Sequence, residues 1–178
     1  LVEDNTIIGG HGDLTIAIEI SGLQNPEIIN NIIFGGEAVS TAHGIRSIAA
    51  AVPLIVENEI DGGYTGTTYG IYLENSSPDI RDNHIFGGRA TTGNAYGIYN
   101  VSFSSPDIEN NDIIGGEGPT VYGIFLNSSS PIIKGNRISS GFANTNGYAV
   151  QCTSSSNAQI INNIISGEEA AGIANGLF

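Results

Sequence analysis

Prolines recur along this chain at nearly constant intervals, and this recurrence limits the fold more than any other feature. The intervals are 27, 25, 28 and 25 residues between Pro26, Pro53, Pro78, Pro106 and Pro131. Ala158 occupies the next slot, 27 residues later. A fixed period in this range is typical of a chain built from stacked structural repeats. The sequence therefore predicts a solenoid.

Each repeat places isoleucine two and seven residues after its proline position and asparagine five residues after it. The asparagine column contains Asn5, Asn31, Asn58, Asn83, Asn111, Asn136 and Asn163. The two isoleucine columns contain Ile28, Ile55, Ile80, Ile108, Ile133 and Ile160, and Ile7, Ile33, Ile60, Ile85, Ile113, Ile138 and Ile165. A third apolar column, beyond a gap of variable length, contains Ile18, Ile45, Ile71, Ile98, Ile124, Val150 and Ile173.

The three apolar segments of each repeat are short and bounded by Gly, Ser, Asn and Pro, a pattern typical of strands. They leave no room for a helix of ten or more residues in each unit, which argues against leucine-rich, ankyrin and tetratricopeptide repeats. We therefore predict an all-β fold, a single-stranded parallel β-helix of about seven coils of roughly 26 residues, with three short strands in each coil. No linker interrupts residues 1–178, so we expect one domain. Because Leu1 and Phe178 both lie inside coils, we expect a segment of a longer chain or a domain without terminal caps.

The corners between strands require polar groups that satisfy the backbone. We expect each asparagine of the column to adopt the left-handed conformation that such corners need and to bond to the asparagine of the next coil. Serine pairs before the prolines are expected to serve another corner. All variation in coil length is expected in the inserts between Gly-Gly and Tyr-Gly, on one ridge of the solenoid.

The repeat unit resembles a known family. Its pattern, S-S-P-x-I-x-x-N-x-I-x-G-G and then Y-G-I-Y, is clearest at Ser76–Gly88 and Tyr96–Tyr99. It is similar to the parallel β-helix of the pectin-lyase-like superfold in its repeat-rich bacterial surface form. The resemblance covers essentially the whole chain and implies a right-handed coil. It implies no particular activity, because this fold hosts lyases, hydrolases, adhesins and plain scaffolds.

An aromatic stripe is the first candidate site. Side chains alternate between the faces of a strand, so Tyr72, Tyr99 and Phe125 should point outward where the neighbouring isoleucines point inward. The glycines before those isoleucines should also face outward and leave a flat floor: Gly70, Gly97 and Gly123. Such a face could bind glycan or protein, be covered by a loop, domain or neighbouring molecule, or only stabilise the sheet.

A second aromatic column has the opposite parity and is expected in the core or at a corner. It contains His43, Tyr69, Tyr96, Tyr122 and Tyr148.

Acidic residues form the second candidate site. Asp79 and Asp107 share a column on adjacent coils, where two carboxylates about 5 Å apart repel each other. We expect a solvated face with alternating charges, and a calcium ion or a catalytic pair are the alternatives. Gly10-His11-Gly12 matches one motif of the polygalacturonases of this superfold, but the chain lacks their Asn-Thr-Asp, Asp-Asp and Arg-Ile-Lys motifs.

Composition limits the partners. The net charge is −13 with only 5 Lys and Arg, which argues against nucleic acid and anionic membrane surfaces. The single cysteine, Cys152, excludes an internal disulfide and is expected to be a small core residue. No apolar stretch is long enough for a membrane helix, so we expect no membrane insertion. Composition and resemblance together indicate an extracellular or cell-surface protein.

Three functions follow as hypotheses. The first is a non-enzymatic rigid scaffold or adhesin-like binding module, without a cofactor unless calcium binds, whose partner is a polysaccharide or another surface protein. The second is a structural subunit that assembles with itself into filaments or layers. The third is a polysaccharide-active enzyme, a lyase or glycoside hydrolase.

Overall fold

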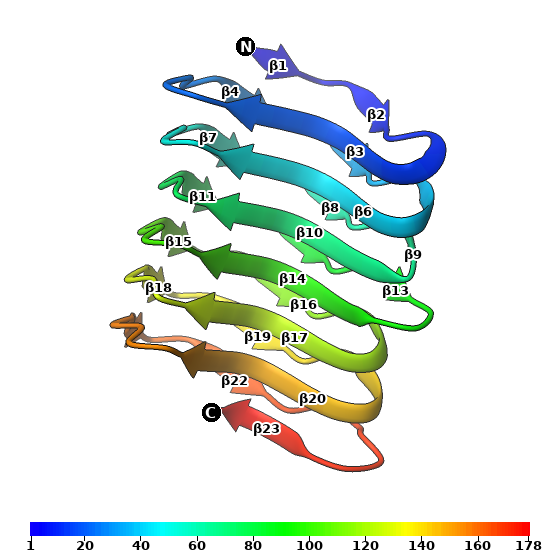
Figure 1. The fold of residues 1–178 in the computed structure, drawn as a ribbon. Helices are drawn as coiled ribbons and strands as arrows, with labels where there is room; N and C mark the ends of the chain where they lie inside the picture. The colour runs from blue at the N-terminus through cyan, green and yellow to red at the C-terminus, as the bar shows by residue number, and fades with distance from the viewer.

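The computed structural model describes residues 1–178 as a solenoid made only of strands, all paired in parallel (Figure 1). The first short sheet contains β1 (Val2–Glu3), β4 (Glu27–Ile29), β7 (Leu54–Val56), β11 (Asp79–Arg81), β15 (Asp107–Glu109), β18 (Ile132–Lys134) and β21 (Gln159–Ile161). The second short sheet contains β2 (Thr6–Ile8), β5 (Ile32–Phe34), β8 (Glu59–Asp61), β12 (His84–Phe86), β16 (Asp112–Ile114), β19 (Arg137–Ser139) and β22 (Ile164–Ser166).

The third sheet, the long sheet, faces the viewer in Figure 1. It contains β3 (His11–Ser21), β6 (Glu37–Ile48), β9 (Tyr64–Thr65), β10 (Thr67–Glu74), β13 (Arg89–Ala90), β14 (Asn94–Val101), β17 (Glu117–Asn127), β20 (Phe142–Thr153) and β23 (Ala174–Leu177). The predicted parallel β-helix is confirmed. The structure contains no helix that is long and apolar enough to cross a membrane.

The predicted isoleucine columns form one continuous core. Ile80, Ile85 and Ile98, one from each column, have no exposed surface. Each pairs in register with the isoleucine of the next coil, so neighbouring coils bury one another's apolar face, as a solenoid requires. The third column ends differently from the prediction, because Val150 pairs with Leu177 while Ile173 lies before β23 and is 48% exposed.

The asparagine column is a continuous hydrogen-bonded ladder between the two short sheets. The side-chain Oδ1 of Asn83 accepts from the backbone N and from Nδ2 of Asn58, at 2.9 and 3.0 Å. Its Nδ2 donates to the carbonyls of Ile55 and Arg81, both at 2.9 Å, and to Oδ1 of Asn111 at 3.0 Å. The expected left-handed conformation lies one residue earlier, for example at Asp82 (φ 56°). The preceding residue makes the corner and leaves the asparagine to satisfy the buried backbone.

The two glycines of each Gly-Gly pair are needed for different structural reasons. A Cβ atom on Gly87 would overlap the carbonyl oxygen of Gly115 in the next coil and lie 2.6 Å from the carbonyl carbon of Tyr96. Gly88 instead has φ 91°, in the region that favours glycine. The first glycine therefore permits the coils to approach, and the second makes the corner.

Coil length varies at two places, whereas the sequence predicted all of the variation in the inserts. The inserts vary in length, and so do the turns that follow the long strands. These turns have two consecutive residues of positive φ at Ala49–Ala50, Ser102–Phe103 and Ser154–Ser155, but a single one at Asn75 and Ser128. The coils with two such residues have the 27-, 28- and 27-residue intervals, and the other two have 25.

Asn100 is a polar residue without a partner inside the core. It is 0% exposed, pairs in register between Leu73 and Leu126, and neither atom of its amide has a hydrogen bond. Ser129 Oγ, 29 residues later, is also buried without a partner. Two coils earlier, Ser47 and Ser76 occupy the positions that correspond to Asn100 and Ser129. Their Oγ atoms form a hydrogen bond with each other at 2.7 Å.

We expect Asn100→Ser to raise the free energy of unfolding, because a serine there can bond to Ser129 as Ser47 bonds to Ser76. Asn100→Ala opens the same space without the hydroxyl, so the serine variant should exceed it by about 1 kcal/mol. Urea unfolding followed by circular dichroism measures both variants. Equal stability of the two would contradict the pairing.

Candidate functional site

Tyr72, Tyr99 and Phe125 lie on the outer side of the long sheet, in register on β10, β14 and β17. All three side chains are half-buried. The ring of Tyr99 stacks on both neighbours, at centroid distances of 5.3 and 5.2 Å and interplanar angles of 16° and 7°. Arg46 precedes this row and Gln151 follows it.

The second aromatic column lies on the same outer side, which corrects the expectation that it faces the core. The rings of Tyr69 and Tyr72 meet edge to face at 5.3 Å, and neither residue belongs to the apolar core. The intervening Gly70 points inward, because a Cβ there would lie 2.8 Å from Cγ2 of Ile85. Gly70 and Ile71 thus face inward consecutively, and this break in alternation removes the expected glycine floor.

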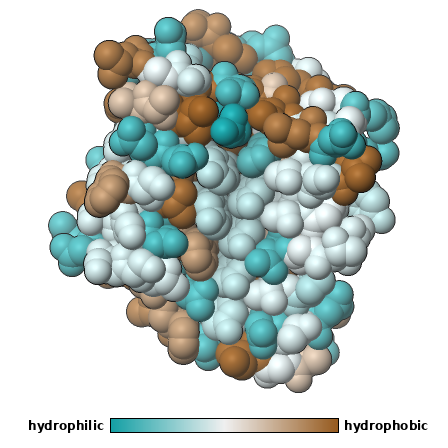
Figure 2. Space-filling model, viewed as in Figure 1, coloured by the Kyte–Doolittle hydropathy of each residue, from teal (hydrophilic) through white to brown (hydrophobic).

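The two columns together form what we call the aromatic face. The inner column is stacked without a gap, at centroid distances from 4.7 to 5.3 Å. The outer column packs against it edge to face. The aromatic face contains His43, Tyr69, Tyr96, Tyr122 and Tyr148 in the inner column and Tyr72, Tyr99 and Phe125 in the outer column. Figure 2 shows this side of the molecule, pale at its centre and more hydrophobic toward the N-terminal coils.

The stacking decides what the aromatic face offers to a partner. Because the rings cover one another's planes, they present edges and hydroxyl groups. Only two of the hydroxyls are bonded within the chain: Tyr72 donates to Glu74 at 3.1 Å, and Tyr96 accepts from Asn94 at 2.9 Å. The other hydroxyls, which are not among the buried unpaired atoms, remain open to water: those of Tyr69, Tyr99, Tyr122 and Tyr148.

Five tyrosine hydroxyls of the aromatic face stay protonated over the physiological range: those of Tyr69, Tyr72, Tyr96, Tyr99 and Tyr122. Burial raises the pKa of Tyr72 and that of Tyr122 to about 12. Burial also raises the pKa of Tyr69, Tyr96 and Tyr99. The open hydroxyls of Tyr69, Tyr99 and Tyr122 can therefore both donate and accept a hydrogen bond.

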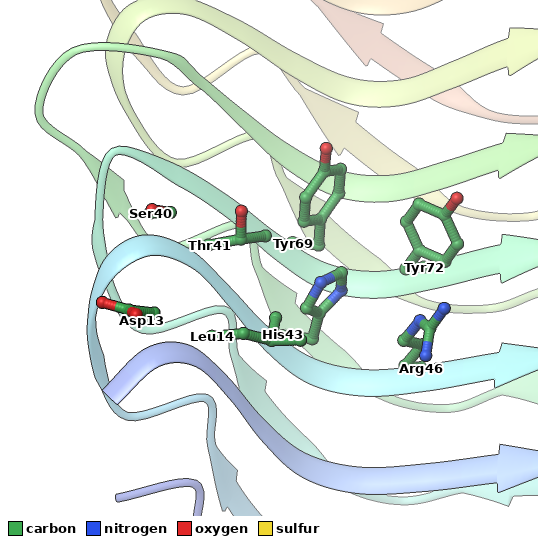
Figure 3. A pocket seen from close by; sticks show the side chains of 8 residues that line it. All are labelled: Asp13, Leu14, Ser40, Thr41, His43, Arg46, Tyr69 and Tyr72. Atoms are coloured by element: carbon green, nitrogen blue, oxygen red, sulfur yellow. The ribbon is translucent and has the colours of Figure 1, made fainter. Parts of the chain in front are cut away.

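A hollow of about 410 Å³ lies at the N-terminal end of the aromatic face (Figure 3). It is lined by Asp13, Leu14, Ser40, Thr41, His43, Arg46, Tyr69 and Tyr72. The Arg46 guanidinium lies 5.9 Å from the centre of the Tyr72 ring and bonds to Glu19 at 3.2 Å. In Figure 3 His43 lies beneath Tyr69, and Arg46 beneath Tyr72.

His43 is the one non-tyrosine of the inner column. It is 5% exposed, stacks on Tyr69 at 4.7 Å and pairs in register with Ile16 on the other side. Its Nδ1 is buried without a partner. Burial, and then the nearby Arg46 charge, lower the pKa of the imidazole to about 4. The ring is therefore neutral at pH 7.

The acidic candidates lie on the first short sheet. Asp79 and Asp107 are in register on β11 and β15, and an Asp79 oxygen lies 3.8 Å from Nε of Arg81. In the next column Lys134 bonds to Glu109 at 2.7 Å. Calcium takes six to eight oxygen ligands, whereas no three His, Cys, Asp or Glu side chains gather where they could hold a metal.

His11 of the Gly-His-Gly motif is exposed and lies 3.1 Å from a Glu37 oxygen. The first residue of each insert stands in register with the next, a column that the sequence pattern alone did not reveal. It contains His11, Glu37, Tyr64, Arg89, Glu117 and Phe142. Arg89 and Glu117 form an ion pair in it at 3.2 Å, whereas Tyr64 and Phe142 are uncharged members of the same column.

The cysteine predicted for the core is at its margin. Cys152 follows Leu126 in register and packs against the core, but it is only half-buried. Burial raises the pKa of its thiol, which favours the neutral form.

Residues 17–176 match a family model described as the right-handed β-helix region, which confirms the expected hand. Two solved structures of trypsin-treated variants of QnrB1, a plasmid-mediated fluoroquinolone resistance protein, are 10% and 11% identical to the chain. They cover 94% and 98% of this chain and 92% and 91% of their own, with TM-scores of 0.22 and 0.24. Likeness at this level supports no conclusion about function. No curated protein matches the sequence.

Proposed function

The chain belongs to the right-handed β-helix family, and we propose that it is a non-enzymatic, extracellular binding module whose aromatic face binds an extended polysaccharide. One observation carries the proposal: each of the strands β10, β14, β17 and β20 presents one open tyrosine hydroxyl. Those of Tyr69, Tyr122 and Tyr148 lie in the inner column and that of Tyr99 in the outer column, and the rings of both columns succeed one another at about 5 Å. A linear polysaccharide also repeats its hydroxyl groups at a short, constant step. The two rows of groups can therefore pair over several coils.

The chemistry of the face favours hydrogen bonding over stacking. A sugar ring cannot lie flat on Tyr99, because Tyr72 and Phe125 already cover its two sides. The open hydroxyls offer donors and acceptors instead, and they sit on rings that are fixed by their neighbours. Such fixed groups lose little conformational freedom on binding. The proposed site is thus an extended polar row on a rigid apolar support.

The test is affinity electrophoresis through gels that contain plant, algal or bacterial polysaccharides. The combined variant Tyr69→Phe, Tyr99→Phe and Tyr122→Phe removes three open hydroxyls and keeps the rings. If the hydroxyls bind the polymer, we expect the variant to bind about tenfold more weakly or worse, because each hydrogen bond contributes about 1 kcal/mol. Tyr64→Phe is the matched control, since Tyr64 is 52% exposed and lies outside the aromatic face.

The outcomes separate the hypotheses. Retardation that the triple variant loses and the control keeps supports a glycan-binding module, provided that the recovered polymer has its original length. If the recovered polymer is shorter, the protein cleaves it, and the proposal of a non-enzymatic module is wrong. If no polymer retards the protein, the proposal fails, and a protein partner or self-assembly takes its place.

A further inference from the structure

The turns after the long strands form a ridge at the left of Figure 1. Phe103 stands on it with φ 65° and 84% of its surface exposed. A bulky residue in this conformation is rare and strained. The corresponding positions two coils before and after hold Ala50 (φ 67°) and Ser155 (φ 61°). The turn therefore does not need an aromatic side chain.

Phe103 borders an open hollow of about 610 Å³. Its other lining residues are Ser105, Ser128, Ser130, Ser154 and Ser155. The backbone N of Phe103 donates to the carbonyl of Ser128 at 2.8 Å, which ties the aromatic residue to the next coil. The Ser128 hydroxyl proton has two acceptors within the chain, the Ser154 carbonyl at 3.0 Å and Asn127 Oδ1 at 3.2 Å.

The remaining hydroxyls of the hollow are free to bind a ligand. Ser105, Ser130, Ser154 and Ser155 are exposed, and their Oγ atoms have no hydrogen bond within the chain. Phe103 stacks on no other ring of the protein. No charged side chain lines the hollow, although the chain has 18 acidic and 5 basic residues. This lining fits an uncharged ligand that has many hydroxyl groups and one apolar side.

We infer that the hollow beside Phe103 is a binding site for a single uncharged sugar ring. The C–H groups on one side of a pyranose carry a slight positive charge and pack on the negative face of a phenyl ring. The sugar hydroxyls at the rim then bond to the free serine hydroxyls. The site stands on different residues from the aromatic face, and it does not depend on the function proposed for that face.

The test uses the full ¹⁵N-labelled chain and methyl glycosides of glucose, mannose and galactose as probes. We expect saturable shifts of the Phe103, Ser128 and Ser130 amide signals with one of them, and a dissociation constant on the order of 1 mM for so small a ligand. Phe103→Ala should weaken binding at least tenfold. Because alanine occupies the same conformation at position 50, this variant keeps the turn.

Two controls separate this site from the other. Tyr64→Ala removes an exposed aromatic residue elsewhere and should leave the shifts unchanged, as should the triple tyrosine variant of the aromatic face. The inference is overturned if none of the three glycosides gives saturable shifts at these amides, or if the shifts persist in Phe103→Ala. Polysaccharide retardation by the aromatic face is unaffected by either result, so the two proposals fail separately.

Discussion

Asn83→Ala is expected to lower the free energy of unfolding by about 3–5 kcal/mol, because it interrupts the asparagine ladder at the centre of the solenoid. The substitution removes the acceptor of two Asn58 groups and the donor to the carbonyls of Ile55 and Arg81. Asn83 is 3% exposed, so water does not replace these bonds without a rearrangement. Each buried group left without a partner costs about 1–3 kcal/mol.

The measurement is urea unfolding followed by far-ultraviolet circular dichroism, since the chain has no tryptophan. Asn127→Ala is the matched control. Asn127 is half-buried, and its side chain accepts only the Ser128 hydroxyl, at 3.2 Å. We expect the control to lose less than about 1 kcal/mol. Similar losses in the two variants would show that the ladder adds no stability beyond that of an ordinary asparagine.

The ladder and the core could be predicted because each depends on a side chain that every coil repeats. A proline position fixes the register, and Ile80 and Asn83 then follow at constant offsets. Parallel pairing stacks the corresponding residues of successive coils on one another. Residues that recur at one offset in the sequence therefore form a column in the structure. The prediction fails at Ile173, where the last insert is short and the offset is no longer constant.

The aromatic face was only half predicted, because strict alternation does not hold through a bend. Gly70 and Ile71 both face inward, which brings Tyr69 to the same side as Tyr72. A signal was present in the sequence. A glycine recurs before the isoleucine of the third column in several coils. Glycine weakens the interior of a strand, so its recurrence there indicates that another group approaches the backbone closely. Here that group is Cγ2 of Ile85, 2.8 Å from the position of a Cβ.

The orientation of the aromatic rings could not be predicted from any pattern of residue types. Whether the ring of Tyr99 lies open to a ligand or is covered by its neighbours depends on rotamers, and those depend on packing against Tyr69 and Tyr96. The exposed Phe103 was missed for another reason. Its importance lies in its conformation and in the hollow beside it, and both depend on which coils have the longer turn.

Acidification is expected to destabilise the fold through His43. The imidazole has a pKa of about 4 in the folded chain, lowered by burial and then by Arg46, against an ordinary value of 6.5. Between these values the unfolded chain binds a proton that folded His43 does not. The free energy of unfolding therefore falls as the pH decreases from 6.5 to 4, and it falls no further below that pH through this group. The full loss is about 3 kcal/mol for a shift of this size.

His43→Tyr continues the tyrosine column of the next coils and removes the titrating group. We expect the difference in the free energy of unfolding between pH 7 and pH 4 to be about 3 kcal/mol smaller in this variant than in the unmodified chain. His43→Phe should give the same reduction without adding a hydroxyl. The comparison cancels the titration of carboxylates that all three proteins share. If all three lose the same stability between pH 7 and pH 4, His43 is not held neutral by burial, and its protonation is accommodated in the hollow that it lines with Arg46 and Tyr72.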